Sequence, residues 1–181
     1  MLRYSFIFSL LLLLGSCNGA QKQGAAQQNM TVFAYLPAEI DTIRVLHRSD
    51  DWASFELIRE ENTVWIIKPL LEQPFKSLND NLLRRYVAYY TQVAVDNIIT
   101  SDNKELTDII ASEDWQYSIR VAARNKPDRT VQLYGIPAAN EEGYDTDKCL
   151  AYIPETKEIA QASWISFDIL LKKFQDFVEK K

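Results

Sequence analysis

Four carboxylates stand close together in one polar stretch and are the densest group of side chains that could do chemistry: Glu141, Glu142, Asp145 and Asp147. A hard cation such as calcium is held by several oxygens at flexible spacing, so this stretch predicts a calcium site. Its order lacks the regular aspartate spacing of an EF-hand loop. A solvated acidic loop is the alternative, and we expect no other metal and no cofactor.

The histidine and one cysteine are the next candidates. His47 is the one histidine of the chain and stands where an expected strand meets a polar turn, which predicts a solvated histidine. Cys149 is expected to be a buried, inert thiol. A bridge to another molecule, a reactive thiol, or a nucleophilic pair of Cys149 with His47 are the alternatives.

The usual catalytic and phosphate-binding motifs are missing from the sequence. Gly135 and Gly143 are the only glycines after residue 30, so no glycine-rich loop can hold a phosphate, and no GxSxG, HExxH or CxxC occurs. We therefore expect a protein that is not an enzyme. The net charge of −5 argues against binding to nucleic acid, which needs a clustered basic surface.

Aromatic residues offer a different kind of site. Tryptophan and tyrosine at element ends can line a ligand groove or a partner surface, and the candidates are Trp52, Tyr90 and Trp115. Packing inside the core is the alternative for each. Tyr90 is placed at the surface because it falls one position off the expected apolar stripe of its helix.

The N-terminal residues carry a covalent signal. Arg3 precedes an apolar run over residues 6–14, which is too short to cross a hydrocarbon core of about 30 Å and is typical of a secretory signal peptide. The run ends in Leu14-Gly15-Ser16-Cys17, which resembles the lipobox of bacterial lipoproteins. The resemblance implies a diacylglycerol on the Cys17 thiol, cleavage before Cys17 and acylation of the new amine. An ordinary secretory signal is the alternative.

The lipobox sets the expected division of the chain. Residues 1–16 are the signal peptide, 17–30 a flexible lipidated tether with a span of about 20 Å, and 31–181 a single globular domain. The lipid on Cys17 is the expected membrane attachment. Because no aspartate follows Cys17, we expect a bacterial envelope location, lipid-anchored at the outer membrane and facing the periplasm.

Hydrophobic periodicity predicts the elements of the domain. Strands are expected over residues 40–46, 54–59, 63–68, 98–99, 115–122, 130–134, 149–153 and 158–162. Helices are expected from Ser77 as N-cap to about residue 95, over 103–112, and from Ser163 as N-cap, with Ser166 as the alternative, to the C-terminus. The last helix is expected to bury Ile165, Ile169, Leu170, Phe174, Phe177 and Val178. The predicted fold class is α+β, an antiparallel sheet (meander plus hairpins) with amphipathic helices packed on one face.

Short motifs along the domain form a second pattern: Ile40-Asp41-Thr42-Ile43-Arg44, Leu57-Ile58-Arg59, Trp65, Lys68-Pro69, Ser77-Leu78, Ile119, Val131, Tyr152 and Phe167-Asp168-Ile169-Leu170-Leu171. The pattern resembles an uncharacterised bacterial envelope domain family, often encoded near ABC-type exporter and gliding-motility-like components. Asp114-Trp115-Gln116-Tyr117 stands where that family has Tyr-Gly-Leu followed by proline. The resemblance implies an accessory or binding role and brings no catalytic residue.

The expected function is therefore a membrane-anchored accessory or protein-interaction module with an envelope protein as partner. The first alternative is a lipoprotein that binds a sugar or peptide in an aromatic-lined groove, and the second is a hydrolase. The oligomeric state stays open.

Overall fold

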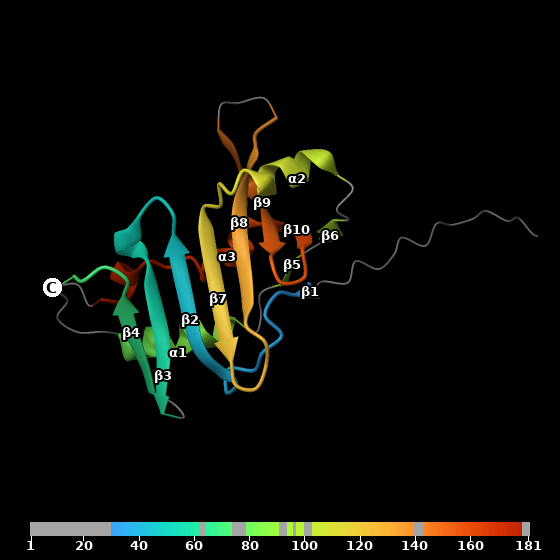
Figure 1. The fold of residues 1–181 in the computed structure, drawn as a ribbon. Helices are drawn as coiled ribbons and strands as arrows, with labels where there is room; N and C mark the ends of the chain where they lie inside the picture. Colours follow the sequence, from blue (N-terminus) through green and yellow to red (C-terminus); the bar gives the residue numbers. More distant parts are fainter. Residues whose placement is uncertain are drawn as a thin grey trace, which may run out of the picture.

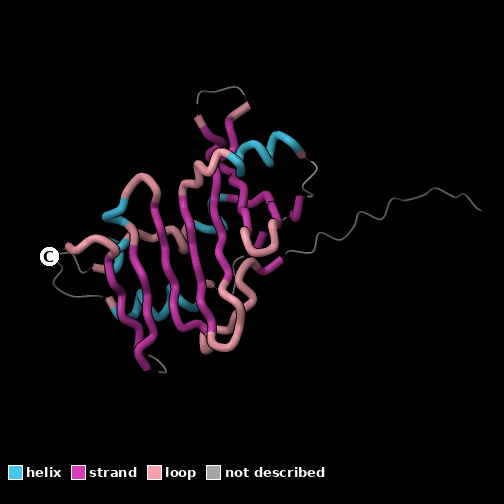
Figure 2. The backbone as a smooth tube through the Cα atoms, viewed as in Figure 1, coloured by secondary structure: helices cyan, strands magenta, loops and turns pink. Residues whose placement is uncertain are grey.

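The fold is built on one large antiparallel sheet (Figure 1, Figure 2). The structure is a computed structural model and describes residues 30–61, 64–73, 79–90, 94–95, 97–99, 103–139 and 143–178. Eight strands pair in the order β4-β3-β2-β7-β8-β9-β10-β6, and β1 pairs with β5 in a separate two-stranded ribbon. The strands are β1 (Met30–Thr31), β2 (Ile40–His47), β3 (Phe55–Glu61), β4 (Val64–Pro69), β5 (Ala94–Val95), β6 (Asn97–Ile99), β7 (Tyr117–Ala123), β8 (Arg129–Pro137), β9 (Tyr144–Ile153) and β10 (Glu158–Ser163).

Helical segments are short. They are η1 (Asp51–Ala53), α1 (Asp80–Tyr89), α2 (Lys104–Ala111), α3 (Trp164–Phe167) and η2 (Phe174–Phe177). None of these helices, which cover only the described part of the chain, has the length and apolar composition that crossing a bilayer needs. The predicted α+β class, mostly antiparallel sheet with some helix, is confirmed.

Side-chain alternation gives the sheet two different faces. Successive residues of a strand point to opposite sides, so Leu133 and Ala151, which pair across β8 and β9, lie on one face, while Tyr134 and Leu150 lie on the other. The first face carries the main core over all the central strands. On the second face, Tyr134, Leu150 and Ile159 form a smaller buried apolar cluster, and Leu106, Ile109 and Ile110 of α2 pack there. The helices therefore do not share one face, because α2 covers the side opposite the main core.

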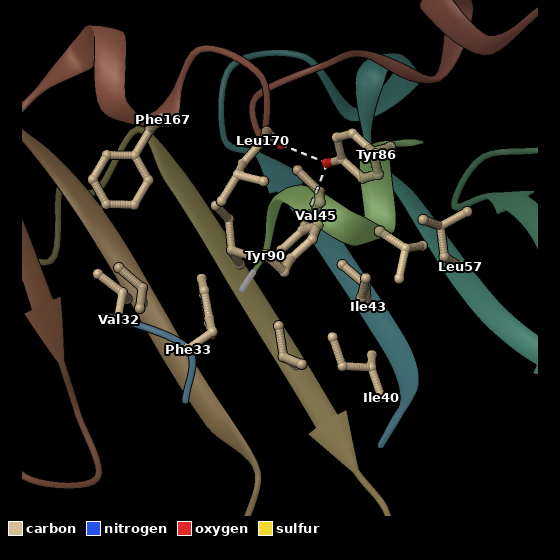
Figure 3. Close-up of a cluster of buried hydrophobic side chains, with 14 of the residues drawn as sticks. Val32, Phe33, Ile40, Ile43, Val45, Leu57, Tyr86, Tyr90, Phe167 and Leu170 are labelled. Carbon is tan, nitrogen blue, oxygen red and sulfur yellow. Dashed lines mark hydrogen bonds between the residues drawn. The ribbon is translucent and has the colours of Figure 1, made fainter. Parts of the chain in front are cut away.

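Helix α1 closes the main core through two tyrosines. Tyr86 and Tyr90 are fully buried, four residues apart on one side of the helix. The Tyr90 hydroxyl donates to the Tyr86 oxygen at 2.9 Å, and the Tyr86 hydroxyl donates to the Leu170 carbonyl at 2.5 Å (Figure 3). Burial raises the pKa of both phenols. The helix is thus joined to the C-terminal segment by a buried hydrogen-bond chain.

Both ends of α1 differ from the sequence prediction, since the helix ends at Tyr89 and Ala94–Val95, predicted to be helical, form β5. Asn79 is the N-cap, and its side-chain oxygen accepts the N–H of Leu82 at 3.0 Å. Ser77, the predicted cap, lies outside the described residues. The buried stripe consists of Leu83, Tyr86, Val87 and Tyr90. It is rotated from the stripe that helical spacing in the sequence predicts, which is Leu78, Leu82, Tyr86, Tyr89 and Val93.

The predicted long C-terminal helix is wrong. Ser163 does cap α3, but the helix ends at Phe167, and Lys173 is extended before η2 begins. Ile165 is 82% exposed and Ile169 36% exposed, whereas Leu170, Phe174 and Phe177 are buried as expected. Contacts of residues 172–178 with the end of the sheet replace the helical hydrogen bonds that a continuous helix would make.

The buried phenol chain yields a stability prediction. Tyr86→Phe leaves the Tyr90 hydroxyl and the Leu170 carbonyl without their bonds, so we expect unfolding in urea to show a loss of about 1–3 kcal/mol. Tyr89→Phe, on the half-buried side of the same helix, should change stability by less than about 0.5 kcal/mol. Equal losses in the two variants would contradict a role for the buried hydroxyl.

Candidate functional site

Three segments meet at one end of the sheet, at the top of Figure 1. Arg48 follows β2, residues 112–116 connect α2 to β7, and Tyr144 begins β9. The backbone N–H of Arg48 donates to the Gln116 carbonyl at 3.0 Å, which continues the pairing of β2 with β7 by one step. The sheet thereby holds the Arg48 side chain next to the 112–116 connection.

Arg48 and Asp114 form the polar centre of this end. Their side chains pair at 3.6 Å, and the guanidinium lies 5.5 Å from the centroid of the Trp115 ring. The guanidinium also donates to the carbonyl of Glu113, a residue whose φ of 56° lies in the left-handed region as the chain leaves α2. Because the side chains of Arg48 and Asp114 are 45% and 61% exposed, the pair contributes little stability and stays accessible to a partner.

Two clefts adjoin at Asp114. One encloses about 470 Å³ and is lined by Arg48, Ser49, Asp114, Trp115, Gln116 and Tyr117. The other encloses about 420 Å³ and is lined by Glu105, Asp108, Ile109, Ser112, Asp114, Gly135, Pro137 and Tyr144. The first offers a guanidinium, a carboxylate and an amide, and the second adds carboxylates from α2 and the ring of Tyr144.

Gly135 makes room for the wall of the second cleft. A Cβ at this position would lie 2.5 Å from Cδ1 of Tyr144 and 2.6 Å from Nε2 of Gln116. The lack of a side chain lets the Tyr144 ring lie against the sheet, where its hydroxyl is 3.5 Å from the Asp114 carboxylate. Tyr144 remains 50% exposed and can contact a bound molecule.

Trp52 lies at the same end of the sheet, four residues after Arg48. It is 53% exposed, and its carbonyl accepts hydrogen bonds from the side chains of Gln73 at 2.9 Å and Gln175 at 2.8 Å. We call the accessible side chains at this end of the sheet the sheet-end surface. They are Arg48, Asp114, Trp115 and Tyr144 around the clefts, and Trp52 in η1, which lines neither cleft.

The three aromatic candidates differ in how far the structure exposes them. Trp52 is exposed and Trp115 is half-buried at a cleft, so the structure brings both to the sheet-end surface. Tyr90 is fully buried, and its prediction as a surface aromatic is wrong. Its ring packs 5.5 Å from Phe33 and 5.4 Å from Tyr86, which pulls that side of α1 into the core.

His47 and Cys149 are both buried. His47 is 4% exposed, so the predicted solvated turn histidine is wrong. The reason is that the C-terminal segment covers it, with the Lys172 carbonyl 3.3 Å from its Nε2. Cys149 is fully buried as predicted, and burial raises the pKa of its thiol to about 12, so the thiolate that a nucleophile needs is disfavoured.

The acidic stretch is only partly described. Glu141 and Glu142 lie outside the described residues, and Asp145 and Asp147 are part of β9. The Asp145 carboxylate accepts the backbone N–H groups of Asp147 at 2.8 Å and Lys148 at 3.0 Å, bonds that lower its pKa. Within the described ranges, no three histidine, cysteine or acidic side chains are placed to hold a metal ion.

Sequence reasoning missed Arg48, Asp114, Gly135 and Tyr144. Nothing in their spacing joins them, since strand pairing and the β8–β9 connection bring them together. Gly135 was the available clue, as one of two glycines in the folded region and the one inside a strand.

Comparisons of the chain with protein-family models, with curated proteins and with solved structures found no match. The class of protein is therefore defined by its own fold, an α+β domain built on a mainly antiparallel sheet. The resemblance to an envelope domain family receives no support from these comparisons.

Calcium binding by Glu141, Glu142, Asp145 and Asp147 stays a prediction. If the four side chains share an ion, adding calcium should raise the melting temperature and removing it with EGTA should lower it, since a ligand of the folded state stabilises that state. Asp147→Asn should abolish the difference, while Asp128→Asn, in the turn before β8, should keep it. An unchanged melting temperature would leave a solvated acidic loop.

Proposed function

We propose that this protein is an envelope lipoprotein whose domain acts as a non-catalytic interaction module. Support for the anchor comes from the short apolar run that ends at Cys17. Two or three acyl chains suffice for stable attachment, because each buried methylene contributes about 0.8 kcal/mol and one chain alone is marginal. The anchor confines the domain near the bilayer and raises its effective concentration toward membrane-bound partners.

The observation that carries the proposal is the sheet-end surface. Its two clefts adjoin at Asp114, and the side chains of Arg48, Asp114 and Tyr144 around them are about half exposed. Exposed tryptophan, tyrosine and arginine are the residue types that dominate the free energy of protein association. The one histidine and the one thiol of the described chain are buried, so a hydrolase finds little support here.

The tether is long enough to present this surface. Residues 18–29 separate Cys17 from the first described strand, and a flexible chain of that length spans about 17–21 Å. β1 pairs with β5 beside β10, near the β6 edge of the sheet (Figure 1). Trp52 belongs to η1, which connects β2 to β3 in the half of the sheet that ends at β4. The tether therefore joins the domain away from Trp52 and leaves that residue free for a partner.

Anchoring is tested by Cys17→Ser. We expect the variant to leave the membrane fraction and to lose incorporation of radioactive palmitate, because the acylated thiol is gone. Cys149→Ser is the matched control and should remain in membranes, since that thiol is buried in the domain. Retention of the Cys17 variant in membranes would refute the lipoprotein proposal.

The interaction surface is tested with a photo-crosslinking amino acid placed at Trp52 or Ser49 in cells. We expect one discrete envelope protein to be captured from these positions and not from Arg44, an exposed residue on the open polar face of the sheet. With that partner purified, Trp52→Ala should weaken binding about tenfold or more, and Arg44→Ala should leave the Kd unchanged. Equal losses in the two variants would refute this surface.

The second candidate is a small ligand, a sugar or a peptide, held in the 470 Å³ cleft beside Trp115. Trp115 already packs against the cluster of Tyr134, Leu150 and Ile159 and under Arg48, so less of its ring is left for stacking. A ligand that changes tryptophan fluorescence and raises the melting temperature, with no captured protein, would favour this candidate.

A further inference from the structure

The last part of the described chain closes the core as a strap, residues 172–178. The Phe177 ring packs 5.2 Å from Phe55 and 5.0 Å from Tyr86, both edge-on. The Phe177 carbonyl accepts the N–H of Asn79 at 2.9 Å, at the start of α1. Outside the core, the Gln175 side chain donates to the Trp52 carbonyl. The strap thus joins the helix, the aromatic core and the sheet-end surface.

His47 lies directly beneath this strap. Its Nε2 is 3.3 Å from the Lys172 carbonyl, which can only accept, so Nε2 carries the hydrogen of the neutral ring. The ring packs edge-on at 5.1 Å from Tyr117, and the backbone N–H donates to the Ser54 hydroxyl at 2.9 Å. The ring is therefore enclosed by β7, the η1 turn and the strap together.

The charged groups around His47 come from two segments. Asp50 of the turn after β2 pairs with Lys173 of the strap at 3.3 Å, and Asp176 lies one helical turn further along. Tyr117 of β7 is the titratable group on the sheet side. Burial is the largest influence and lowers the pKa of His47, Lys173 lowers it further, and the Lys172 carbonyl, Asp50 and Asp176 oppose them.

We propose that His47 is a pH-sensitive switch for this strap, so that protonation of the buried ring releases residues 172–178 from the end of the sheet. The neutral ring fits the enclosed site, whereas the protonated ring gains a hydrogen at Nδ1 and a positive charge beside Lys173. The charged ring is accommodated in water once the strap is open. The proton comes from solvent, and no covalent bond changes.

The direction of the pH dependence follows from linkage. His47 binds its proton less readily in the closed state than in the open state, whose ordinary pKa is 6.5. The closed state of the strap is therefore most stable relative to the open state above pH 6.5, and this stability decreases as the pH falls below that value. The opening constant rises by up to tenfold per pH unit until the closed-state pKa is reached.

Opening would also act on the sheet-end surface, because Gln175 holds the Trp52 carbonyl. That consequence rests on the proposed function, whereas strap opening rests on the contacts of His47 alone. An acid-responsive strap suits a domain in a compartment whose pH follows the surroundings.

The first test is an NMR titration of the untagged, unlipidated domain. The chain has one histidine, so its Cε1–H signal needs no assignment. We expect a midpoint below pH 6.5 for the native protein, and a midpoint at or above 6.5 would overturn the proposal. Lys173→Gln should raise the midpoint, since it removes the cation that faces the ring.

The second test is hydrogen exchange between pH 7.5 and 5. After correction for intrinsic rates, the Asn79 amide, which donates to the strap, should exchange up to tenfold faster per pH unit below 6.5, while central β7 amides should not. His47→Gln should remove this acceleration, and the same acceleration in the variant would overturn the proposal. If the variant does not fold, the titration of the native protein decides.

A third measurement separates the two proposals. If the strap opens in acid but affinity for the captured partner does not change, the pH switch at His47 is supported and its coupling to Trp52 is refuted. If affinity falls in acid with no strap opening, the pH switch at His47 is refuted and the proposed interaction surface is not.

Discussion

The hydrogen-bond chain through the Tyr86 hydroxyl joins the two parts of the chain that must come together to close the core. Tyr90 donates into it from the same helix, and Leu170 accepts from the C-terminal segment. A phenol buried at this depth is tolerated only when it is hydrogen-bonded, because an unpaired polar group costs about 1–3 kcal/mol. These hydrogen bonds therefore set both the rotation of α1 about its axis and the path of the C-terminal segment. Figure 3 shows the two tyrosines among apolar side chains of the sheet.

That path decides what happens at the end of the sheet. After Leu170 the chain turns across His47 and Trp52, so the segment that completes the core also covers one titratable ring and supports one exposed tryptophan. Arg48 lies on the far side of the same strand end, next to Asp114. The segment that closes the core thus also supports the Trp52 part of the sheet-end surface, whereas strand pairing holds Arg48.

The two faces of the sheet differ in polarity. The face under α1 is apolar across the central strands, while the opposite face carries charged ladders such as Arg44 with Glu56 and Arg120 with Asp128. Where α2 crosses, that face carries a buried apolar cluster. The 112–116 connection leaves α2 at the border between these regions, which is why clefts form there.

Strands were the most predictable part of the structure, because alternation of apolar and polar residues is a local property that a buried face requires. β2, β3, β7 and β8 all fall within a few residues of their predicted ranges. Tyr90 and His47 were misplaced because their burial depends on segments far away in the chain. The last helix was predicted to be too long. The spacing of Leu170, Phe174 and Phe177 fits one side of a helix, but a turn followed by the strap buries the same three residues.

The sequence by itself determined the strands of the large sheet, though not β1 or β5, together with the α+β class and the burial of Cys149. It also singled out Trp52 and Trp115 as candidate surface aromatics. It also supplied the lipobox-like run that ends at Cys17, which the folded domain does not test. Only the tertiary structure decided which face each helix covers, that Tyr90 is core, and that Arg48 meets Asp114. The physical reason is that periodicity records which side of an element is apolar, whereas contacts across the sheet depend on register and on segments that meet only in the folded chain.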